Sequence, residues 1–298
     1  MERESLLTIL VVLLGGLALQ PAALLSLRAL PAGGGRAAER SAWLRLWLPV
    51  VPTLLVAAWL CGWALQEPDP VHDYVDRWVL IGACLPFALV AVRAVLRAIW
   101  ALAQKPAERD ICTAGLLRPR ILFSPFLAKA LDEGQVGAAW EHERAHVRHC
   151  DPLRIWLAQI ATDMQWPWPW ARERFNAWLE VLECARDDEA RRNGASGVDL
   201  AAAVLATVRQ SVATPSARGT LWKFGVPTDA LLVGNLQALQ RRIARLLSPL
   251  QELEASPGRL LAGLPSAEVS LIGALLIACA LGVHYGEHLL PPLLAWFS

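Results

Sequence analysis

The stretch "EHERAHVRHCD", residues 141–151, places three of the chain's six histidines among glutamate, arginine and aspartate. Its core, "HERAH" at 142–146, has the pattern H-E-x-x-H. On a helix, a spacing of four residues places both imidazoles on one face about one turn apart, as two ligands of a tetrahedral zinc ion require. The alternative is a solvated helix that carries surface histidines.

The residue that follows the first of these histidines offers a general base. Glu143 would lie beside the expected metal, where it can take a proton from a water that zinc polarises. Zinc lowers the pKa of such a water toward about 7, so a carboxylate base prepares it to attack an amide carbonyl. The stretch therefore predicts hydrolysis of peptide bonds, with Glu143 as the catalytic residue.

A catalytic zinc also needs a third protein ligand and an open fourth position. The best candidate for the third ligand is Glu183, in "LECARDDEA" at 182–190, although an acidic exposed helix face would give the same pattern. Asp187 lies one helical turn further along, where its carboxylate can hydrogen-bond the free nitrogen of a ligand histidine and fix its tautomer.

Two further polar residues of the opening stretch are expected to support the site without binding the metal. His149 continues the stripe of histidines, but a rigid helix holds it about 10 Å further along its axis than His142. Asp151 follows the predicted helix, where it can cap or anchor it. We expect both to lie near the ligands and outside the ligand set.

The rest of the chain is unusually apolar. Of its 298 residues, 55% are hydrophobic and 18% are charged, whereas soluble proteins carry about 25% charged residues. The net charge of +1 leaves no basic surplus to neutralise phosphates, so direct binding of nucleic acid is not expected. The six cysteines contain no C-x-x-C pair, which excludes a zinc ribbon and a thioredoxin-like motif.

Four apolar stretches are long enough to cross a bilayer. They define a membrane region at 1–103 with three spans at about 5–27, 46–66 and 78–100, and a fourth span with a short outer tail at 268–298. A cleavable signal peptide is the alternative for the first span, although its basic region is weak. The residues between the third and fourth spans, 104–267, form a separate polar domain. The expected fold is therefore a mainly α membrane protein with four transmembrane helices.

The charges of the loops orient these spans. The first loop carries four arginines against one acid: Arg28, Arg36, Arg40, Arg45 and Glu39. The second loop is mainly acidic. The positive-inside rule places the first loop in the cytoplasm. The polar domain is then cytoplasmic, and both the N-terminus and the C-terminus lie outside.

Local patterns predict the elements of this domain. Two short β-prone runs, 109–113 and 120–124, precede a helix over 134–149 that carries the histidines and ends at Asp151-Pro152. Asp132 and Gln135 predict a capping box at the start of that helix. Later helices are expected at 171–192, 199–210 and 230–247, with a loop at 211–229. The tryptophans of "WPWPW" at 166–170 suit either a membrane interface or a packed core.

The order of these motifs resembles a known family. "AGLLRPRILFSP" (114–125), "HERAHVRHCDPL" (142–153), "WPWPW" (166–170), "ECARDDEA" (183–190) and "QRRIARLL" (240–247) are similar to the integral membrane zinc metallopeptidases of the BlaR/MecR type. These are the protease modules of beta-lactam-sensor proteins. The resemblance implies that 104–267 is a gluzincin-like α+β metalloprotease domain that holds one zinc ion per chain.

The resemblance also assigns roles to individual residues. It implies His142, His146 and Glu183 as zinc ligands and Glu143 as the base, with Asp187 as the acidic residue four positions after the third ligand. It further implies an edge strand along which an extended peptide substrate lies. The residues of that strand are Arg120, Ile121, Leu122 and Phe123.

The family also suggests a biological setting, with one departure. Its members lie in the bacterial inner membrane and act in regulated proteolysis or signalling, so the expected substrate is a cytoplasmic or membrane-surface protein, for example a transcriptional repressor. The sensor members continue beyond the last span into a penicillin-binding domain, whereas this chain ends shortly after it. A beta-lactam-binding domain is therefore not expected in this chain.

Two other classes of protein compete with the peptidase. A non-catalytic signalling or scaffold protein would use zinc for structure alone, but such a site has no use for the base Glu143. An intramembrane protease would place its motif in an apolar span. Residues 141–151 contain eight charged or histidine residues in eleven, which is too costly for exposure to lipid.

Overall fold

The structure is a computed structural model of the chain, and its residues are mostly helical. It describes residues 16–21, 23, 35–64, 85, 88–99, 112–122, 129–166, 168–213, 222–223, 226–227, 236–249 and 273–284. The chain divides into two compact units. One comprises Met1–Arg28, Leu44–Leu89 and Leu253–Ser298, and the other comprises Ala29–Trp43 and Val90–Glu252.

The first unit contains apolar helices. A 3-10 turn, η2 (Leu48–Val50), leads into α3 (Val51–Ala64), which has no charged residue. A helix over 273–284 approaches α3 closely, because a Cβ placed on Gly62 would lie 2.0 Å from the backbone oxygen of Cys279. Glycine is therefore required at position 62.

Among the described residues, one helical run is long and apolar enough to cross a membrane. It extends over Ala38–Trp59 and includes most of α2 (Arg36–Trp47), so it begins earlier than the predicted span at 46–66. Within the other three predicted spans, residues 16–21, 88–99 and 273–284 are helical. The remaining parts of those spans lie outside the described residues.

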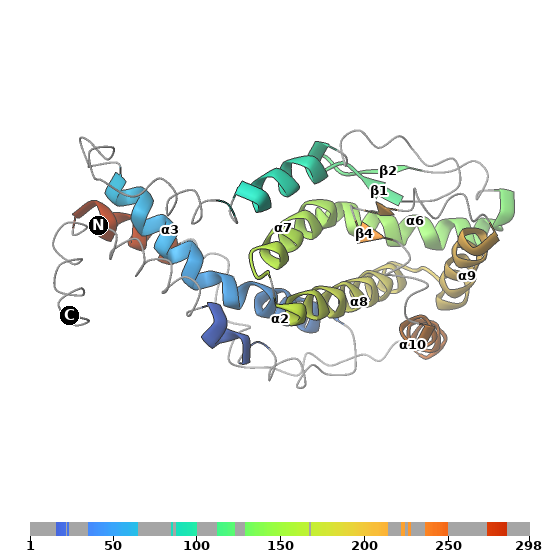
Figure 1. Cartoon of the computed structure of the whole chain (residues 1–298). Helices are drawn as coiled ribbons and strands as arrows, with labels where there is room; N and C mark the ends of the chain where they lie inside the picture. The colour runs from blue at the N-terminus through green and yellow to red at the C-terminus, as the bar shows by residue number, and fades with distance from the viewer. Residues whose placement is uncertain are drawn as a thin grey trace. The chain divides into compact units, whose positions relative to one another are not determined.

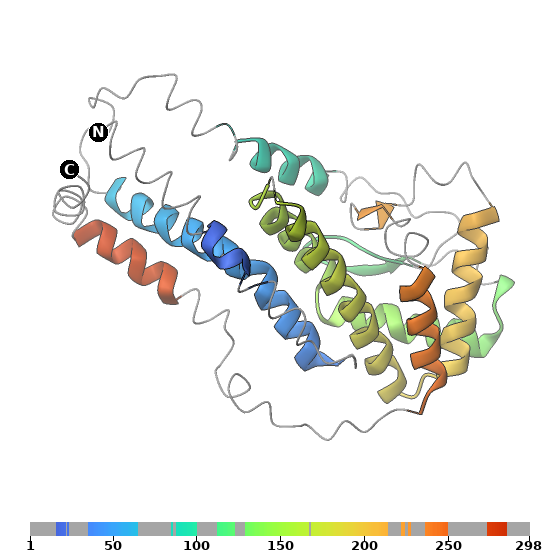
Figure 2. The ribbon, with the colours of Figure 1, turned by 60° about the horizontal axis from the view of Figure 1, so that its bottom comes forward.

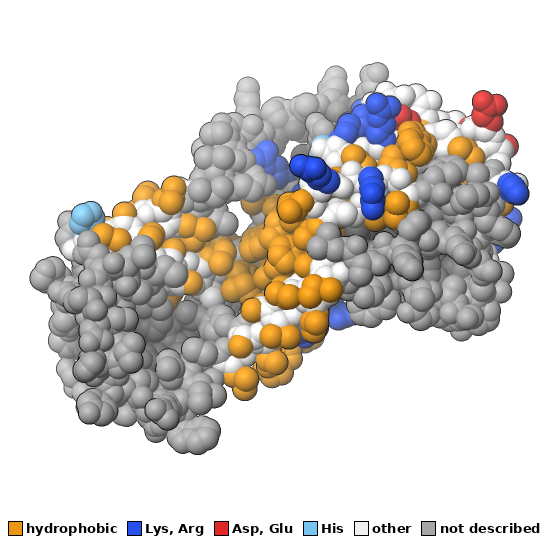
Figure 3. Space-filling model, turned by 90° about the horizontal axis from the view of Figure 1, so that it is seen from above, with side chains coloured by type: hydrophobic (Ala, Val, Ile, Leu, Met, Phe, Trp, Pro, Cys, Tyr) orange, Lys and Arg blue, Asp and Glu red, His pale blue; other side chains and the backbone are white. Residues whose placement is uncertain are grey.

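The helix over 88–99 belongs largely to the second unit and has two contrasting faces. Arg97 NH1 lies 2.5 Å from Asp163 Oδ2, and the backbone oxygen of Ala94 accepts a hydrogen bond from Trp156 Nε1. Apolar side chains on the same helix are more than half exposed: Val92, Val95, Leu96 and Ile99. Exposed hydrophobic side chains are prominent in the space-filling view (Figure 3). Positions 92, 95, 96 and 99 share one face of a helix, so these side chains form an exposed apolar stripe.

A short hairpin precedes the histidine-bearing helix in the second unit. Strands β1 (Cys112–Ala114) and β2 (Arg120–Leu122) overlap the two predicted β-prone runs. They pair antiparallel with Thr113 opposite Ile121, a pairing that was not predicted. Gly115 begins the turn with φ of +102°, a conformation that glycine adopts without strain. A second pair, β3 (Trp222–Lys223) and β4 (Val226–Pro227), lies where a loop was predicted.

The helix α6 (Glu133–Arg148) lies at the centre of this unit (Figure 1). It packs against α8 (Pro169–Arg192) and α9 (Gly197–Ala213) and contacts the β1–β2 hairpin and α7 (Asp151–Asp163). The predicted capping box is confirmed, since Gln135 N donates to Asp132 Oδ1 at 2.8 Å. Asp151 follows this helix as predicted, and of its two predicted roles it anchors the helix, since its Oδ2 lies 2.8 Å from His146 Nδ1, while His149 is the C-cap. Cys150 turns the chain with φ of +51°, and Asp151 begins α7 (Asp151–Asp163).

Three further helices complete the unit: α8 (Pro169–Arg192), α9 (Gly197–Ala213) and α10 (Leu236–Leu247). They match the predicted helices with shifted ends, and α8 begins at a proline because proline suits the first turn of a helix. Figure 2 shows α10 lying beside α9. The core here is apolar and joins α6, α8, α9 and α10 through Ala138, Ala190, Leu200, Ala201 and Leu246.

The tryptophan-rich turn between α7 and α8 is largely exposed. Trp166 is 76% exposed and Trp170 is 39% exposed, while Trp168 and Trp170 stack with ring centres 6.1 Å apart. Core packing, one of the two interpretations of this motif, is therefore wrong for Trp166.

Candidate metal centre

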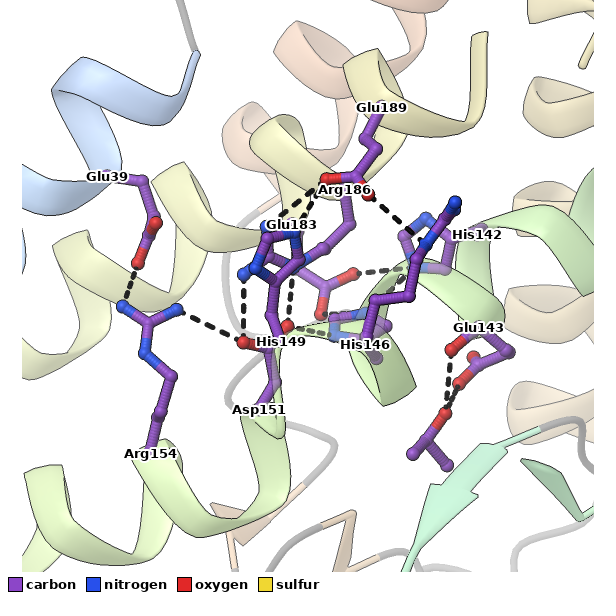
Figure 4. A network of polar contacts seen from close by, with 12 residues as sticks. Glu39, His142, Glu143, His146, His149, Asp151, Arg154, Glu183, Arg186 and Glu189 are labelled. Carbon is purple, nitrogen blue, oxygen red and sulfur yellow. Dashed lines mark hydrogen bonds and ion pairs between the residues drawn. The ribbon is translucent and has the colours of Figure 1, made fainter. Parts of the chain in front are cut away.

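Two helices bring the three predicted ligands together. His142 and His146 lie one turn apart on α6, and Glu183 faces them from α8 (Figure 4). The Nε2 atoms of the histidines are 3.1 Å apart. Glu183 Oε2 lies 3.4 Å from Nε2 of His142, and Oε1 lies 3.6 Å from Nε2 of His146. The three residues offer ligand atoms within 4.8 Å of one another.

These separations fit a tetrahedral zinc site. Zinc binds nitrogen and carboxylate oxygen at about 2.0–2.2 Å, so neighbouring ligand atoms of a regular tetrahedron lie about 3.3–3.6 Å apart. The two histidine nitrogens are 3.1 Å apart and each lies 3.4 or 3.6 Å from a different oxygen of Glu183, so one ligand atom from each residue lies within 4.8 Å of the others and the three can surround one ion. Two imidazoles and one carboxylate are also a donor set that zinc accepts in catalytic sites.

His146 is held from behind by a buried ion pair. Its Nδ1 lies 2.8 Å from Asp151 Oδ2, and Arg186 donates to the same carboxylate through Nε at 2.5 Å and NH2 at 2.8 Å. All three side chains are fully buried. Burial acts to raise the pKa of Asp151, but the bonds from Arg186 and His146 hold it well below its usual value. Asp151 therefore stays ionised and fixes the His146 tautomer that leaves Nε2 facing the site.

His142 has its own carboxylate partner. Its Nδ1 lies 2.9 Å from Asp187 Oδ1, as the spacing of Asp187 and Glu183 predicted. Burial acts to lower the pKa of His142, yet the contacts with Asp187 and Glu183 outweigh it and raise that pKa to about 9. Without a metal, the site therefore holds a proton on His142, which a metal ion would have to displace.

Arg242 on α10 is a site residue that the sequence analysis missed. Its Nε and NH2 groups lie 2.7 and 2.8 Å from the Asp187 carboxylate, and NH1 lies 2.9 Å from Glu183 Oε2. Burial acts to raise the pKa of Glu183, but the Arg242 charge contributes most to holding it well below its usual value. The basic helix motif "QRRIARLL" was the available signal, without indicating which arginine reaches the ligands.

The predicted base is buried beside the ligands. Glu143 is 3% exposed, and its Oε2 lies 2.8 Å from the hydroxyl of Thr113 on β1. The same hydroxyl is 3.1 Å from the backbone oxygen of Glu143. Thr113 is a second residue that the sequence analysis missed, because nothing in a short strand indicates which helix it touches.

The remaining predicted site residues are His149, at the end of α6, and the residues of the predicted substrate-binding strand. Nε2 of His149 lies 2.8 Å from Glu189 Oε2, and the metal cluster does not include it. Strand β2 contains Arg120, Ile121 and Leu122, and among the described residues it pairs with β1 alone. Phe123 lies outside the described residues.

Comparisons of the chain with known protein families, with curated proteins and with solved structures found no match.

Proposed function

We propose that this chain is a membrane-embedded zinc endopeptidase of the BlaR/MecR type, with one zinc ion held by His142, His146 and Glu183. The observation that carries the proposal is the cluster of His142, His146 and Glu183, whose ligand atoms lie within 4.8 Å of one another, with Glu143 buried on the helix that carries both histidines. A purely structural zinc site needs metal ligands but no general base. A hydrolytic site needs the base as well.

Each residue has a distinct task in hydrolysis. Zinc, when bound there, would polarise the scissile carbonyl and lower the pKa of a water toward about 7. Glu143 takes the proton of that water and later delivers it to the leaving amine. Asp151 and Asp187 orient the two imidazoles through their Nδ1 atoms, and Arg242 holds Glu183 and Asp187 in place.

The proposed substrate is a protein segment that binds in extended form. Strand β2, with Arg120, Ile121 and Leu122, has one neighbour among the described residues, so its other edge offers backbone groups to a peptide. The apolar composition and the helical run Ala38–Trp59 support a membrane protein. The four spans of the proposal come from the apolar stretches of the sequence, and the bacterial inner membrane comes from the family resemblance. In that arrangement the peptidase faces the cytoplasm and acts in regulated proteolysis, for example on a transcriptional repressor.

The test combines metal content with cleavage. The detergent-purified wild-type chain is compared with Glu143→Ala and Glu183→Ala. The zinc content per chain is measured by elemental mass spectrometry. Cleavage is followed on peptides from digested bacterial cytosol by the appearance of new N-termini. We expect about one zinc in wild type and Glu143→Ala, cleavage in wild type alone, and loss of zinc in Glu183→Ala. A wild-type protein without zinc, or equal cleavage by Glu143→Ala, would refute the proposal.

A further inference from the structure

A chain of buried and half-buried charges leads away from the candidate metal centre (Figure 4). Asp151, which holds His146, also accepts a hydrogen bond from Arg154 NH1 on α7 at 3.1 Å. The NH2 group of Arg154 donates to Glu39 Oε1 on α2, 115 residues earlier in the chain. Glu39 is 6% exposed and Asp151 is 0% exposed. One guanidinium therefore joins the carboxylate behind a metal ligand to a carboxylate on a distant helix.

Aromatic rings fix Arg154 between these two carboxylates. Its guanidinium carbon lies 5.0 Å from the ring centre of Trp43 and 5.8 Å from that of Trp178. The two indoles are themselves 5.1 Å apart, and Trp178 Nε1 lies 3.4 Å from Glu39 Oε1. A planar guanidinium can stack on indoles while it binds two carboxylates, whereas a lysine ammonium cannot replace it in both respects. The arrangement is specific to arginine.

The helix that carries Glu39 can affect its contact with Arg154. Glu39 and Trp43 lie on α2, in the helical run Ala38–Trp59 that is long and apolar enough to cross a membrane. Residues of one helix move together, so a shift of α2 would move the Glu39 carboxylate relative to Arg154. Glu39 is also the one acid among the arginines of the first predicted loop, and hydrolysis itself makes no use of it.

We propose that Glu39 and Arg154 are positioning residues for the zinc ligand His146, and that α2 regulates the metal centre through them. Glu39 offsets part of the Arg154 charge, which leaves Asp151 a stronger acceptor for the His146 N–H group. A stronger acceptor makes the imidazole a better zinc ligand and fixes its tautomer. When Glu39 withdraws, Arg154 acts on Asp151 alone and His146 binds zinc more weakly. The inference rests on the proposed function in taking zinc as the bound ion.

The experiment measures metal binding in the full chain in detergent. Zinc affinity is obtained by competition with a chelating dye, and the coordination geometry is followed by the visible absorption of the cobalt(II)-loaded protein. We expect Glu39→Gln to weaken zinc binding about threefold to tenfold, less than the 10–100-fold typical of a direct partner of a ligand, and to change the cobalt spectrum. The matched control is Glu173→Gln, which removes an exposed carboxylate from α8 and should change neither quantity.

A double-mutant cycle tests whether Glu39 affects zinc binding through Asp151. In an Asp151→Asn background, Glu39→Gln should have no further effect on zinc affinity, because the link between them is already broken. If Asp151→Asn does not fold, Arg154→Lys replaces it in the same cycle. Lysine keeps the positive charge but lacks the planar guanidinium that binds both carboxylates. An unchanged zinc affinity in Glu39→Gln, an equal change in Glu173→Gln, or the same loss in the mutant background would overturn the inference.

The measurement separates this inference from the proposed function. A wild type that binds zinc but cleaves no peptide refutes the peptidase, while the affinity ratio between wild type and Glu39→Gln still decides the role of Glu39. A wild type that cleaves peptides while Glu39→Gln binds zinc normally refutes the inference alone. A wild type without zinc refutes both.

Discussion

The hydroxyl of Thr113 lies 2.8 Å from the carboxylate of Glu143, and both side chains are buried. This contact ties the first strand of the hairpin to the proposed base on α6. A hydrogen bond to a carboxylate restricts its rotation. Thr113 therefore sets the direction of the proposed base beside the three candidate metal ligands.

Replacing Thr113 by valine removes the hydroxyl and keeps the shape of the side chain. We expect the zinc content to stay at one per chain and kcat for peptide cleavage to fall about tenfold, a part of the 10²–10⁴-fold that a general base contributes. Zinc analysis and steady-state kinetics measure the two quantities. Thr113→Ser, which keeps the hydroxyl, is the control and should retain most of kcat. Equal kcat in wild type and Thr113→Val would show that the bond does not orient the base.

Arg242→Met should destabilise the metal-free protein. The substitution leaves Asp187 and Glu183 without their common guanidinium, and an uncompensated buried charge costs about 3 to 5 kcal/mol. Thermal unfolding in detergent, followed by circular dichroism, measures the effect. Arg241→Met is the matched control, because the exposed Arg241 lies 3.4 Å from the partly exposed Glu180 and such pairs contribute little. Similar unfolding midpoints for both variants would contradict a structural role of Arg242.

The site residues that share one helix could be predicted from their spacing in the sequence. His142, Glu143 and His146 share one helix, so their relation depends on helical geometry alone, and the capping box at Asp132 follows from the same rule. The helices α8 and α9 were also predicted, with ends displaced by a few residues because capping and tertiary packing decide where a helix stops.

Long-range pairings were not predictable in the same way. Arg242 and Thr113 reach the site through the packing of α10 and β1 against the other elements, and many arginines and threonines could have filled these places. Asp151 was assigned to the end of one helix because a residue before proline avoids the helical conformation. The structure uses Cys150 for the turn instead, which frees Asp151 to begin α7 and reach His146.

The stability of the metal-free protein should fall as the pH rises from 7 to 9. The pKa of His142 is about 9 in the folded protein and 6.5 when unperturbed, so its protonated form stabilises the fold. This contribution is complete below pH 6.5 and is lost as the pH rises through 9; a shift of this size corresponds to on the order of 3 kcal/mol. Chemical unfolding at several pH values measures it. In the zinc-loaded protein the proton is already displaced, so the decrease should be absent; its persistence there would point to another group.

His149→Gln should leave the metal centre intact, whereas His146→Gln should abolish it. The two histidines share α6, but His146 Nε2 faces His142 and Glu183, while His149 Nε2 contacts Glu189. His149 is also the residue that closes the end of the helix, where its backbone N–H donates to Ala145. Glutamine keeps that backbone bond and can still donate to Glu189, so the fold should survive. The zinc content of both purified variants tests this prediction. A folded His149→Gln protein without zinc would mean that the third ligand is His149 and that the assignment of Glu183 is wrong.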